Sequence, residues 1–524
     1  MFISSAIKSF NRTRPLILSL PWIGFAIQIS ISSDSSNVSY AFIAAAISTL
    51  FILYLYRPDQ WINYPISSLT LFGYCIVYAL GPLLSTAVEN RTITYNLVAL
   101  EDLFLQMLLC SGVLLFTHFL YSRSKLFQFA RTRINYFLLR RLNVFQELNQ
   151  FNVIFIGAFG LSSMIYVYWF NRGESSVLIK LIQGFIPFSY IPLALLLKPL
   201  CLGIESTKKS DIGINCVFLL LIIIASLGRN SRSAFATPIA TYGIGVLMLW
   251  LFQWIKFRLR IVIPLILVIL LILPLASNLA TAMVMVRSLR GDVPTQELIV
   301  ETTQQLTNPE SIERYRLSKS GTGANGWDES YVSNPFLARF VNLKFADSSL
   351  DLENQLSKSS RSEYFKFTVN RFWSIFPSPL LNFIGISEDV KKQVTSISWG
   401  DQLFFLITRN KSVLGGFRVG HFFGTSLAAF GYFYLPLLGI LSIIIFILLD
   451  ALVTYIPSCP TSPIIAPIGL LSFYDFFIFF NAPSLVKYAE FILRGWIQLI
   501  LIYVLLLYLS STICKLFVQK SKLA

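Results

Sequence analysis

The chain has 524 residues, of which 55% are hydrophobic and only 13% are charged, and its mean hydropathy is +0.66. Soluble domains carry about 25% charged residues, so this composition excludes an ordinary soluble protein. The formal net charge is +16. In a membrane protein, such an excess of Lys and Arg is typical of cytoplasmic loops and of segments that contact anionic lipid. The positive charge therefore does not indicate a nucleic-acid-binding protein.

Apolar residues occur in runs of about 20, the length of a helix that crosses the hydrocarbon core of a bilayer. Every backbone N–H and C=O group in lipid must be hydrogen-bonded, which favours helices. The strands of a membrane barrel would be shorter, and polar and apolar residues would alternate along them. We therefore predict an all-α polytopic membrane protein with about 12 transmembrane helices. The predicted spans are 15–31, 38–56, 66–84, 98–121, 151–170, 177–200, 212–227, 234–255, 261–283, 421–455, 463–482 and 491–513. The tenth is too long for one straight helix: either Pro436 kinks it, or its first part is re-entrant or lies at the membrane interface.

Clusters of Lys and Arg predict the orientation of these spans. If twelve spans alternate, five clusters fall on one side, which the positive-inside rule identifies as the cytoplasm. Both termini are then cytoplasmic. The clusters are Lys8 with Arg12 and Arg14; Arg123 to Arg141; Lys208 and Lys209; Lys256 to Arg260; and Lys515 to Lys522.

A polar segment of residues 284–415 separates the ninth and tenth spans and is predicted to lie outside the cytoplasm. It divides the chain into helices of residues 1–283, one large loop domain of residues 284–415, and helices of residues 416–524. Loops this long are commonly functional. The chain has no Walker A or G-x-G-x-x-G pattern, which disfavours a nucleotide-driven pump.

Two pairs of Arg residues break the charge rule, because they are predicted on the outer side. Arg229 and Arg232 lie in the turn between the seventh and eighth spans, and Arg287 and Arg290 follow the ninth span. A guanidinium group holds phosphate oxygens in bidentate fashion and stays charged at every physiological pH. These residues are candidate phosphate ligands, and the alternative is that they anchor the helix ends to lipid head groups.

A third group of candidates lies where the large loop rejoins the membrane. It comprises Asp401, Arg409, Arg418 and His421, among several glycines that let a ligand approach the backbone. Neighbouring cations are expected to lower the pKa of His421 and keep its imidazole neutral, as a general base requires. Asp401 is the competing base. The alternative for His421 is an interfacial residue bonded to the backbone.

The remaining titratable residues point to structure or to no site at all. His118 is expected to be structural, and Asp475, inside the eleventh span, is expected to face the bundle, where Arg494 is its candidate partner. The six Cys form no C-x-x-C pair and the chain has only two His. No metal, cofactor or disulfide framework is therefore expected.

Several of these features resemble the O-antigen polymerase (Wzy) and O-antigen ligase family. They are the outer turn Gly228-Arg229-Asn230-Ser231-Arg232-Ser233, the large late loop, and the Gly-rich stretch from Gly415 to Gly424 that leads into Phe430-Gly431-Tyr432. Some members carry an Arg-x10-Gly spacing in two outer loops, which Arg232 with Gly243 and Arg409 with Gly420 reproduce. We therefore expect Arg232 and Arg409 to line one anionic cavity. Ligases resemble the chain through a His that ends the large loop and is followed by Gly, as in His421 and Gly431.

The resemblance implies a metal-independent glycosyltransferase with a GT-C-like fold in the bacterial inner membrane. Such an enzyme polymerises polyprenyl-diphosphate-linked repeat units at the outer face. The Arg residues would stabilise the charge that develops on the diphosphate leaving group, and a base would accept the proton of the acceptor hydroxyl. The expected partners are lipid-linked glycans and membrane lipid. Whether a chain-length regulator or a flippase binds stays open.

Three alternatives stay open. A ligase would move finished glycan to another lipid and is barely separable from a polymerase by sequence. A flippase or other transporter should show internal symmetry and ionisable residues near the membrane midplane, and neither is clear in the sequence. A non-catalytic envelope assembly protein is the third. The sequence does not identify the sugar, the linkage or the polymer.

Overall fold

The protein is described from a computed structural model that covers residues 2–170, 177–202, 208–228, 232–252, 277–279, 281–286, 293, 295–318, 330–334, 337–383, 385, 387–416, 418–456 and 459–523. Within these residues, nine helices are long and apolar enough to cross a membrane. They are Thr13–Ile31, Ser35–Leu55, Pro65–Val88, Leu100–Arg123, Gln150–Phe170, Leu178–Leu196, Lys209–Leu227, Phe422–Asp450 and Leu485–Leu516. The prediction of a multi-pass, predominantly helical membrane protein is confirmed. The count of twelve spans and the GT-C-like fold stay predictions.

The elements follow one another in three groups. Before the large loop come α1 (Phe2–Ile31), α2 (Ser35–Leu55), α3 (Pro58–Asn63), α4 (Pro65–Cys75), η1 (Ile76–Leu80), α5 (Gly81–Val88), α6 (Leu100–Arg123), α7 (Lys125–Arg133), η2 (Ile134–Leu139), α8 (Gln150–Ile165), η3 (Tyr166–Phe170), α9 (Val177–Gln183), η4 (Ile186–Tyr190), α10 (Leu193–Leu196), α11 (Lys198–Leu202), α12 (Lys209–Leu227) and α13 (Arg232–Leu251). The loop contains α15 (Thr295–Leu306), α16 (Pro309–Ser318), η6 (Leu337–Arg339), α17 (Leu343–Asn354), α18 (Lys358–Trp373), α19 (Ser378–Phe383), α20 (Glu388–Ser396), α21 (Trp399–Thr408) and η7 (Lys411–Val413). After it come α22 (Phe422–Phe430), η8 (Gly431–Phe433), α23 (Tyr434–Asp450), β1 (Val453–Ile456), β2 (Cys459–Ile465), α24 (Pro467–Leu471), α25 (Phe473–Phe477), α26 (Leu485–Glu490), η9 (Phe491–Gly495) and α27 (Trp496–Leu523).

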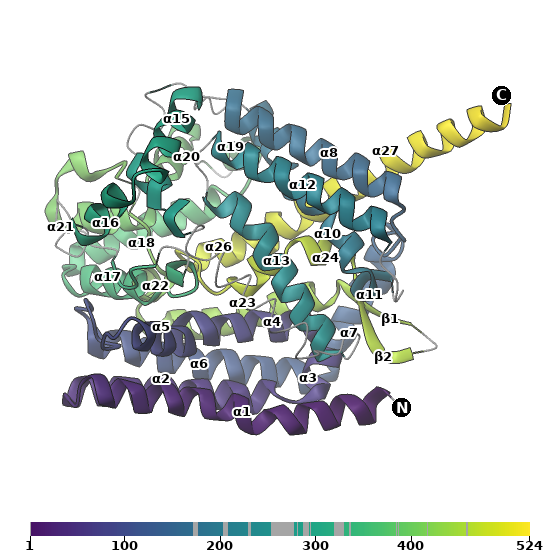
Figure 1. The fold of residues 1–524 in the computed structure, drawn as a ribbon. Coiled ribbons are helices and arrows are strands. Elements are labelled where there is room, and N and C mark those ends of the chain that lie inside the picture. The colour runs from purple at the N-terminus through teal and green to yellow at the C-terminus, as the bar shows by residue number, and fades with distance from the viewer. Residues whose placement is uncertain are drawn as a thin grey trace.

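The loop helices and the two chain termini lie at opposite ends of the molecule (Figure 1). Helices α1, α2 and α6 run lengthwise along one side, the loop helices gather at one end, and N, C and the β1–β2 hairpin lie at the other. This arrangement agrees with termini on one side of a membrane and the loop on the other. We refer to the loop end as the outer end, following the orientation predicted from Lys and Arg.

Two segments cross the bundle as interrupted helices. The predicted span 177–200 breaks into α9, η4, α10 and α11, with Pro187, Pro192 and Pro199 removing backbone donors along it. The predicted span 463–482 is not one helix, because β2 continues to Ile465 and only α24 and α25, of five residues each, follow. Backbone of this kind is tolerated at membrane depth only where protein or an enclosed cavity surrounds it.

The long predicted span 421–455 is also broken, but not at Pro436 as expected. Pro436 lies in the first turn of α23, where a missing backbone donor costs nothing. The break falls at Gly431, whose φ of 54° and ψ of −153° end α22. Glycine adopts this backbone conformation readily, whereas residues with a Cβ rarely do. Most of the predicted ninth span, 261–283, lies outside the described residues.

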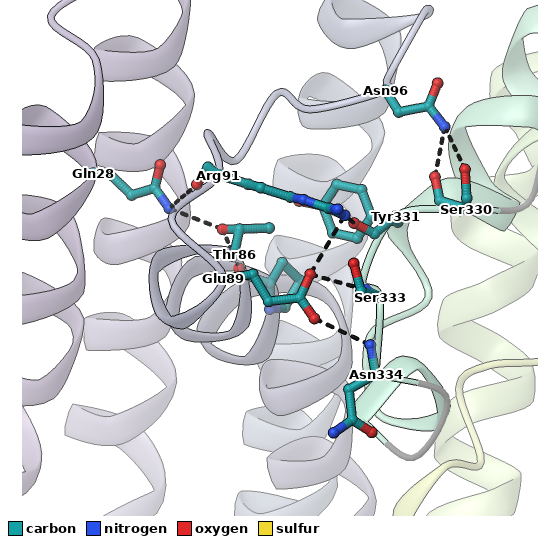
Figure 2. Close-up of polar contacts among 10 residues, drawn as sticks. Gln28, Thr86, Glu89, Arg91, Asn96, Ser330, Tyr331, Ser333 and Asn334 are labelled. Carbon is teal, nitrogen blue, oxygen red and sulfur yellow. Dashed lines mark hydrogen bonds and ion pairs between the residues drawn. The ribbon is translucent and has the colours of Figure 1, made fainter. Parts of the chain in front are cut away.

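Polar contacts fix the large loop to the bundle where α5 ends (Figure 2). The carboxylate of Glu89 accepts hydrogen bonds from the backbone N–H groups of Ser333 at 2.8 Å and Asn334 at 3.1 Å. Arg91 pairs with Glu89 and donates to the carbonyl of Tyr331, and Asn96 donates to Ser330. The loop therefore docks on the outer span ends through side chains that approach its backbone.

Candidate functional site

His421 lies at the start of the helix that follows the large loop, and both of its ring nitrogens are engaged. Its Nδ1 accepts from the backbone N–H of Phe423 at 3.2 Å, which caps α22. Its Nε2 lies 2.6 Å from the hydroxyl of Tyr78, which donates to Asn481 at 2.8 Å. This pattern assigns the ring proton to Nε2.

The side chain of His421 is 1% exposed. Burial lowers the pKa of His421 to about 3, so the predicted neutral imidazole has desolvation as its cause and not the neighbouring cations. To accept a proton from a substrate at Nδ1, His421 would first have to break its bond to Phe423. The geometry favours a residue that positions α22 against Tyr78, and the role of general base stays a prediction.

Asp401 and Arg418 form a buried ion pair. Arg418 donates to the carboxylate of Asp401 from its guanidinium at 3.2 Å and from its backbone N–H at 3.1 Å. Asp401 is 0% exposed and Arg418 is 8% exposed. Because each neutralises the other inside the loop, the pair ties the segment before His421 to the first turn of α21, and contact with a diphosphate would require it to open.

Arg409 points to a different neighbour. It ends α21 with a φ of 55°, and both terminal nitrogens of its guanidinium bind the carboxylate of Glu363 on α18, at 2.7 and 2.9 Å. The pair is half-exposed. Hydrogen bonds from Arg409 lower the pKa of Glu363, so this contact is retained at neutral pH. A surface pair of this kind contributes little stability.

The other predicted phosphate ligands fall where the structure gives no side-chain geometry. Arg229, Arg287 and Arg290 lie outside the described residues, and Arg232 is described only as the first residue of α13. The predicted cavity shared by Arg232 and Arg409 therefore stays a prediction. Tyr190 donates to the carbonyl of Ala234 at 3.2 Å, which places the first turn of α13 beside the interrupted span that contains Tyr190.

Asp475 is not paired with Arg494, contrary to the prediction; the described ion pairs include neither residue. Asp475 is the one exposed residue of α25, whose other four residues are buried. Helix α25 packs against α4 and α13. An accessible carboxylate thus lies in an interrupted segment of the bundle, a position where ionisable residues are commonly functional.

Helix α17 brings charged groups into the outer end that sequence reasoning did not single out. The carboxylate of Asp347 accepts from the backbone N–H groups of Val98 and Ala99, both at 2.8 Å, and from Lys344 at 2.9 Å. Asp347 and Lys344 are both buried. Charged residues at helical spacing resemble an exposed face in sequence, and only the contact with the start of α6 shows that this face is covered.

The part of the chain that the structure describes contains no group of three or more His, Cys, Asp or Glu side chains arranged to hold a metal ion.

We expect His421 to make stability depend on pH. The pKa of about 3 in the folded chain lies below the ordinary value of 6.5. Between these values the unfolded chain binds the proton and the folded chain does not, so stability falls as pH falls. At pH 5 the expected loss is about 2 kcal/mol. The melting temperature of the parent should therefore drop more between pH 7 and pH 5 than that of His421→Asn, which retains a capping oxygen. Parallel pH profiles would contradict this role.

Comparison of the chain with protein families, with curated proteins and with solved structures finds no match.

Proposed function

We propose that this protein polymerises polyprenyl-diphosphate-linked oligosaccharide repeat units at the outer face of a bacterial inner membrane. The observation that carries the proposal is the docking of the large loop. Glu89 and Asp347 bind backbone N–H groups across the contact between the loop and the span ends. The docked loop covers the outer ends of spans that lipid-linked substrates can reach from within the membrane. This arrangement suits a reaction that holds two membrane-anchored glycans together.

The reaction joins two glycans by exchanging one bond for another. A hydroxyl of the acceptor glycan attacks the anomeric carbon of the donor, a new glycosidic bond forms, and the bond from that carbon to the diphosphate breaks. Polyprenyl diphosphate leaves, and the hydroxyl proton passes to a base. Negative charge grows on the leaving diphosphate, which fixed cations stabilise without a metal ion.

We assign the leaving group to cations of the outer end. Arg229, Arg232, Arg287 and Arg290 stay proposed diphosphate ligands from their sequence positions. Arg409 can turn toward substrate only by releasing Glu363, and Arg418 only by releasing Asp401. We therefore expect substitutions of Arg409 and Arg418 to affect diphosphate binding less than substitutions of Arg229, Arg232, Arg287 and Arg290.

A flippase is the second candidate, and a specific observation favours it. Two interrupted segments meet in the bundle, because α10 and η4 contact α24, and Asp475 lies exposed on the adjoining α25. Interrupted helices and intramembrane carboxylates are features of transporters. Asp475→Asn separates the two candidates: a flippase should lose transport of repeat units, whereas a polymerase should still receive them at the outer face.

The glycan of a deletion strain tests the proposal. A polymerase deletion leaves one repeat unit on the carrier or on the final acceptor. A ligase deletion leaves long polymer on the carrier, and a flippase deletion leaves repeat units on the cytoplasmic side. Long polymer on the carrier in the deletion strain would overturn the proposal in favour of a ligase.

A further inference from the structure

Three cationic side chains from distant parts of the chain lie near one another at the outer end, because the charges of two of them act on the third. They are Lys180 on α9, Lys391 on α20 and Arg494 on η9. Gly184, which directly follows α9, lies close to α27, since a Cβ on Gly184 would lie 3.0 Å from Nε2 of Gln498. Lys180 precedes Gly184 by one turn and Arg494 precedes Gln498 by one turn, so both cations lie at the same end of this contact. We call these three residues the junction cluster.

Lys391 joins the junction cluster from the large loop. Its ammonium group donates to the carbonyl of Phe376 at 2.7 Å, and the side chain is half-buried. Burial lowers the pKa of Lys391, and the positive charges of Arg494 and Lys180 lower it further. Glu388 is the acid whose charge acts in the opposite direction. Lys391 therefore experiences two neighbouring cations and one neighbouring anion.

Two members of the junction cluster, Lys180 and Arg494, have no ion-pair partner in the described residues. No described carboxylate lies within 4.0 Å of Lys180 or Arg494, and both side chains are exposed. Glu388 lies 4.0 Å from Lys392, and the nearby Glu490 binds Lys487 at 2.6 Å. Like charges repel, so a fold that holds them together without a counter-charge favours the binding of an anion.

Apolar side chains surround the junction cluster on the helices that carry it. Leu178 and Leu181 on α9 are 63% and 56% exposed, and Leu493 and Ile497 beside Arg494 are 41% and 46% exposed. These residues belong to candidate membrane spans, where we expect exposed apolar side chains to face lipid. The surface thus combines cations with exposed apolar groups on the same helices, which matches a ligand with an anionic head and a hydrocarbon tail.

We propose that the junction cluster binds the phosphate head of a membrane-embedded lipid. The ligand that we assign to the junction cluster is the diphosphate of the polyprenyl-linked glycan, and this assignment rests on the proposed function. A diphosphate offers enough oxygens for all three cations, and Arg494 can bind two of them with its planar guanidinium group. The chain would then hold the lipid beside α9 and α27, where the loop residue Lys391 completes the site.

Binding of defined lipids to the purified full-length chain in detergent tests this inference. The probes are polyprenyl diphosphate, polyprenyl monophosphate, phosphatidylglycerol and phosphatidylcholine, and the measurement is native mass spectrometry with titration. Lys180→Gln and Arg494→Gln should each weaken binding of polyprenyl diphosphate about tenfold, the effect of losing one charge-assisted hydrogen bond. Lys391→Gln should do the same, and Lys391→Arg should restore most of the affinity.

Lys392→Gln is the matched control, because Lys392 is the next residue on α20 and is exposed. It should leave the affinity unchanged. Losses that appear with polyprenyl diphosphate and not with phosphatidylglycerol assign the site to the glycan carrier, and equal losses with both assign it to phosphate head groups in general. Unchanged affinity for every phosphate lipid in the folded triple Gln variant would overturn the inference. A chain that binds the diphosphate but makes no polymer would contradict the proposed function and would still support the lipid-binding site.

Discussion

Replacing Gly424 by Ala should undock the large loop from the membrane helices. A Cβ on Gly424 would lie 2.2 Å from the carbonyl oxygen of Ser349 and 2.3 Å from its carbonyl carbon. Both are backbone atoms of α17, so no side-chain rotation relieves the clash, and α17 would have to move away from α22. Overpacking costs about 1–3 kcal/mol, and a backbone clash of this size belongs at or above the upper value.

The melting temperature of the purified protein in one detergent measures this effect, and limited proteolysis of the loop locates it. Gly424→Ala should melt well below the parent and expose the loop to cleavage. Gly112→Ala is the matched control, because a Cβ on this helical glycine of α6 meets nothing within 4 Å. It should be as stable as the parent. Equal melting temperatures for Gly424→Ala and Gly112→Ala would show that α17 does not pack against α22 as described.

The second large effect is expected at the other end of the molecule, where Asp450 binds four donors. Its Oδ1 accepts from the backbone N–H groups of Ile66 and Ser67, both at 3.1 Å, and its Oδ2 accepts from the hydroxyls of Ser67 at 2.5 Å and Tyr121 at 3.1 Å. The two N–H groups belong to the first turn of α4, which has no intrahelical partner for them. Asp450 therefore caps α4 from the end of α23.

Asp450→Ala would leave these buried donors unsatisfied, at a cost of about 1–3 kcal/mol for each donor that finds no other partner. Asp450→Asn keeps one carbonyl oxygen for the two N–H groups and should lose less. Ser442→Ala, two turns earlier on α23, is the control, since the Ser442 hydroxyl is buried without a hydrogen-bond partner in the described residues. The melting temperatures should fall in the order Ser442→Ala, Asp450→Asn, Asp450→Ala. Asp450→Ala as stable as Ser442→Ala would contradict the capping role.

The apolar runs are sufficient to predict the helical, multi-pass character of the chain. A run such as 38–56 has the length of a span and almost no charge, so its helix follows from the cost of unpaired backbone groups in lipid. The breaks were harder to predict. Gly431 and Pro436 both lie in the same apolar run, and either residue type can break a helix. The sequence alone does not show which of the two ends the helix.

Side-chain partners at the candidate site could not be predicted from the sequence. Asp401 and Arg418 are 17 residues apart, and Arg409 and Glu363 are 46 residues apart. Nothing in the local sequence distinguishes an Arg that is paired with a carboxylate inside the protein from an Arg that is available to bind a substrate. The contact of His118 with the network of Asp450 could not be predicted for the same reason: its Nε2 lies 3.0 Å from the Ser67 hydroxyl, 51 residues away.

The central claim is that this chain by itself lengthens a lipid-linked glycan. The most direct test reconstitutes the purified protein in liposomes with polyprenyl-diphosphate-linked repeat units from its own host as the only glycan. The account predicts a ladder of products longer than one unit, with one polyprenyl diphosphate released for each bond formed and no requirement for added metal ion. Repeat units that stay single in the presence of folded protein would contradict it.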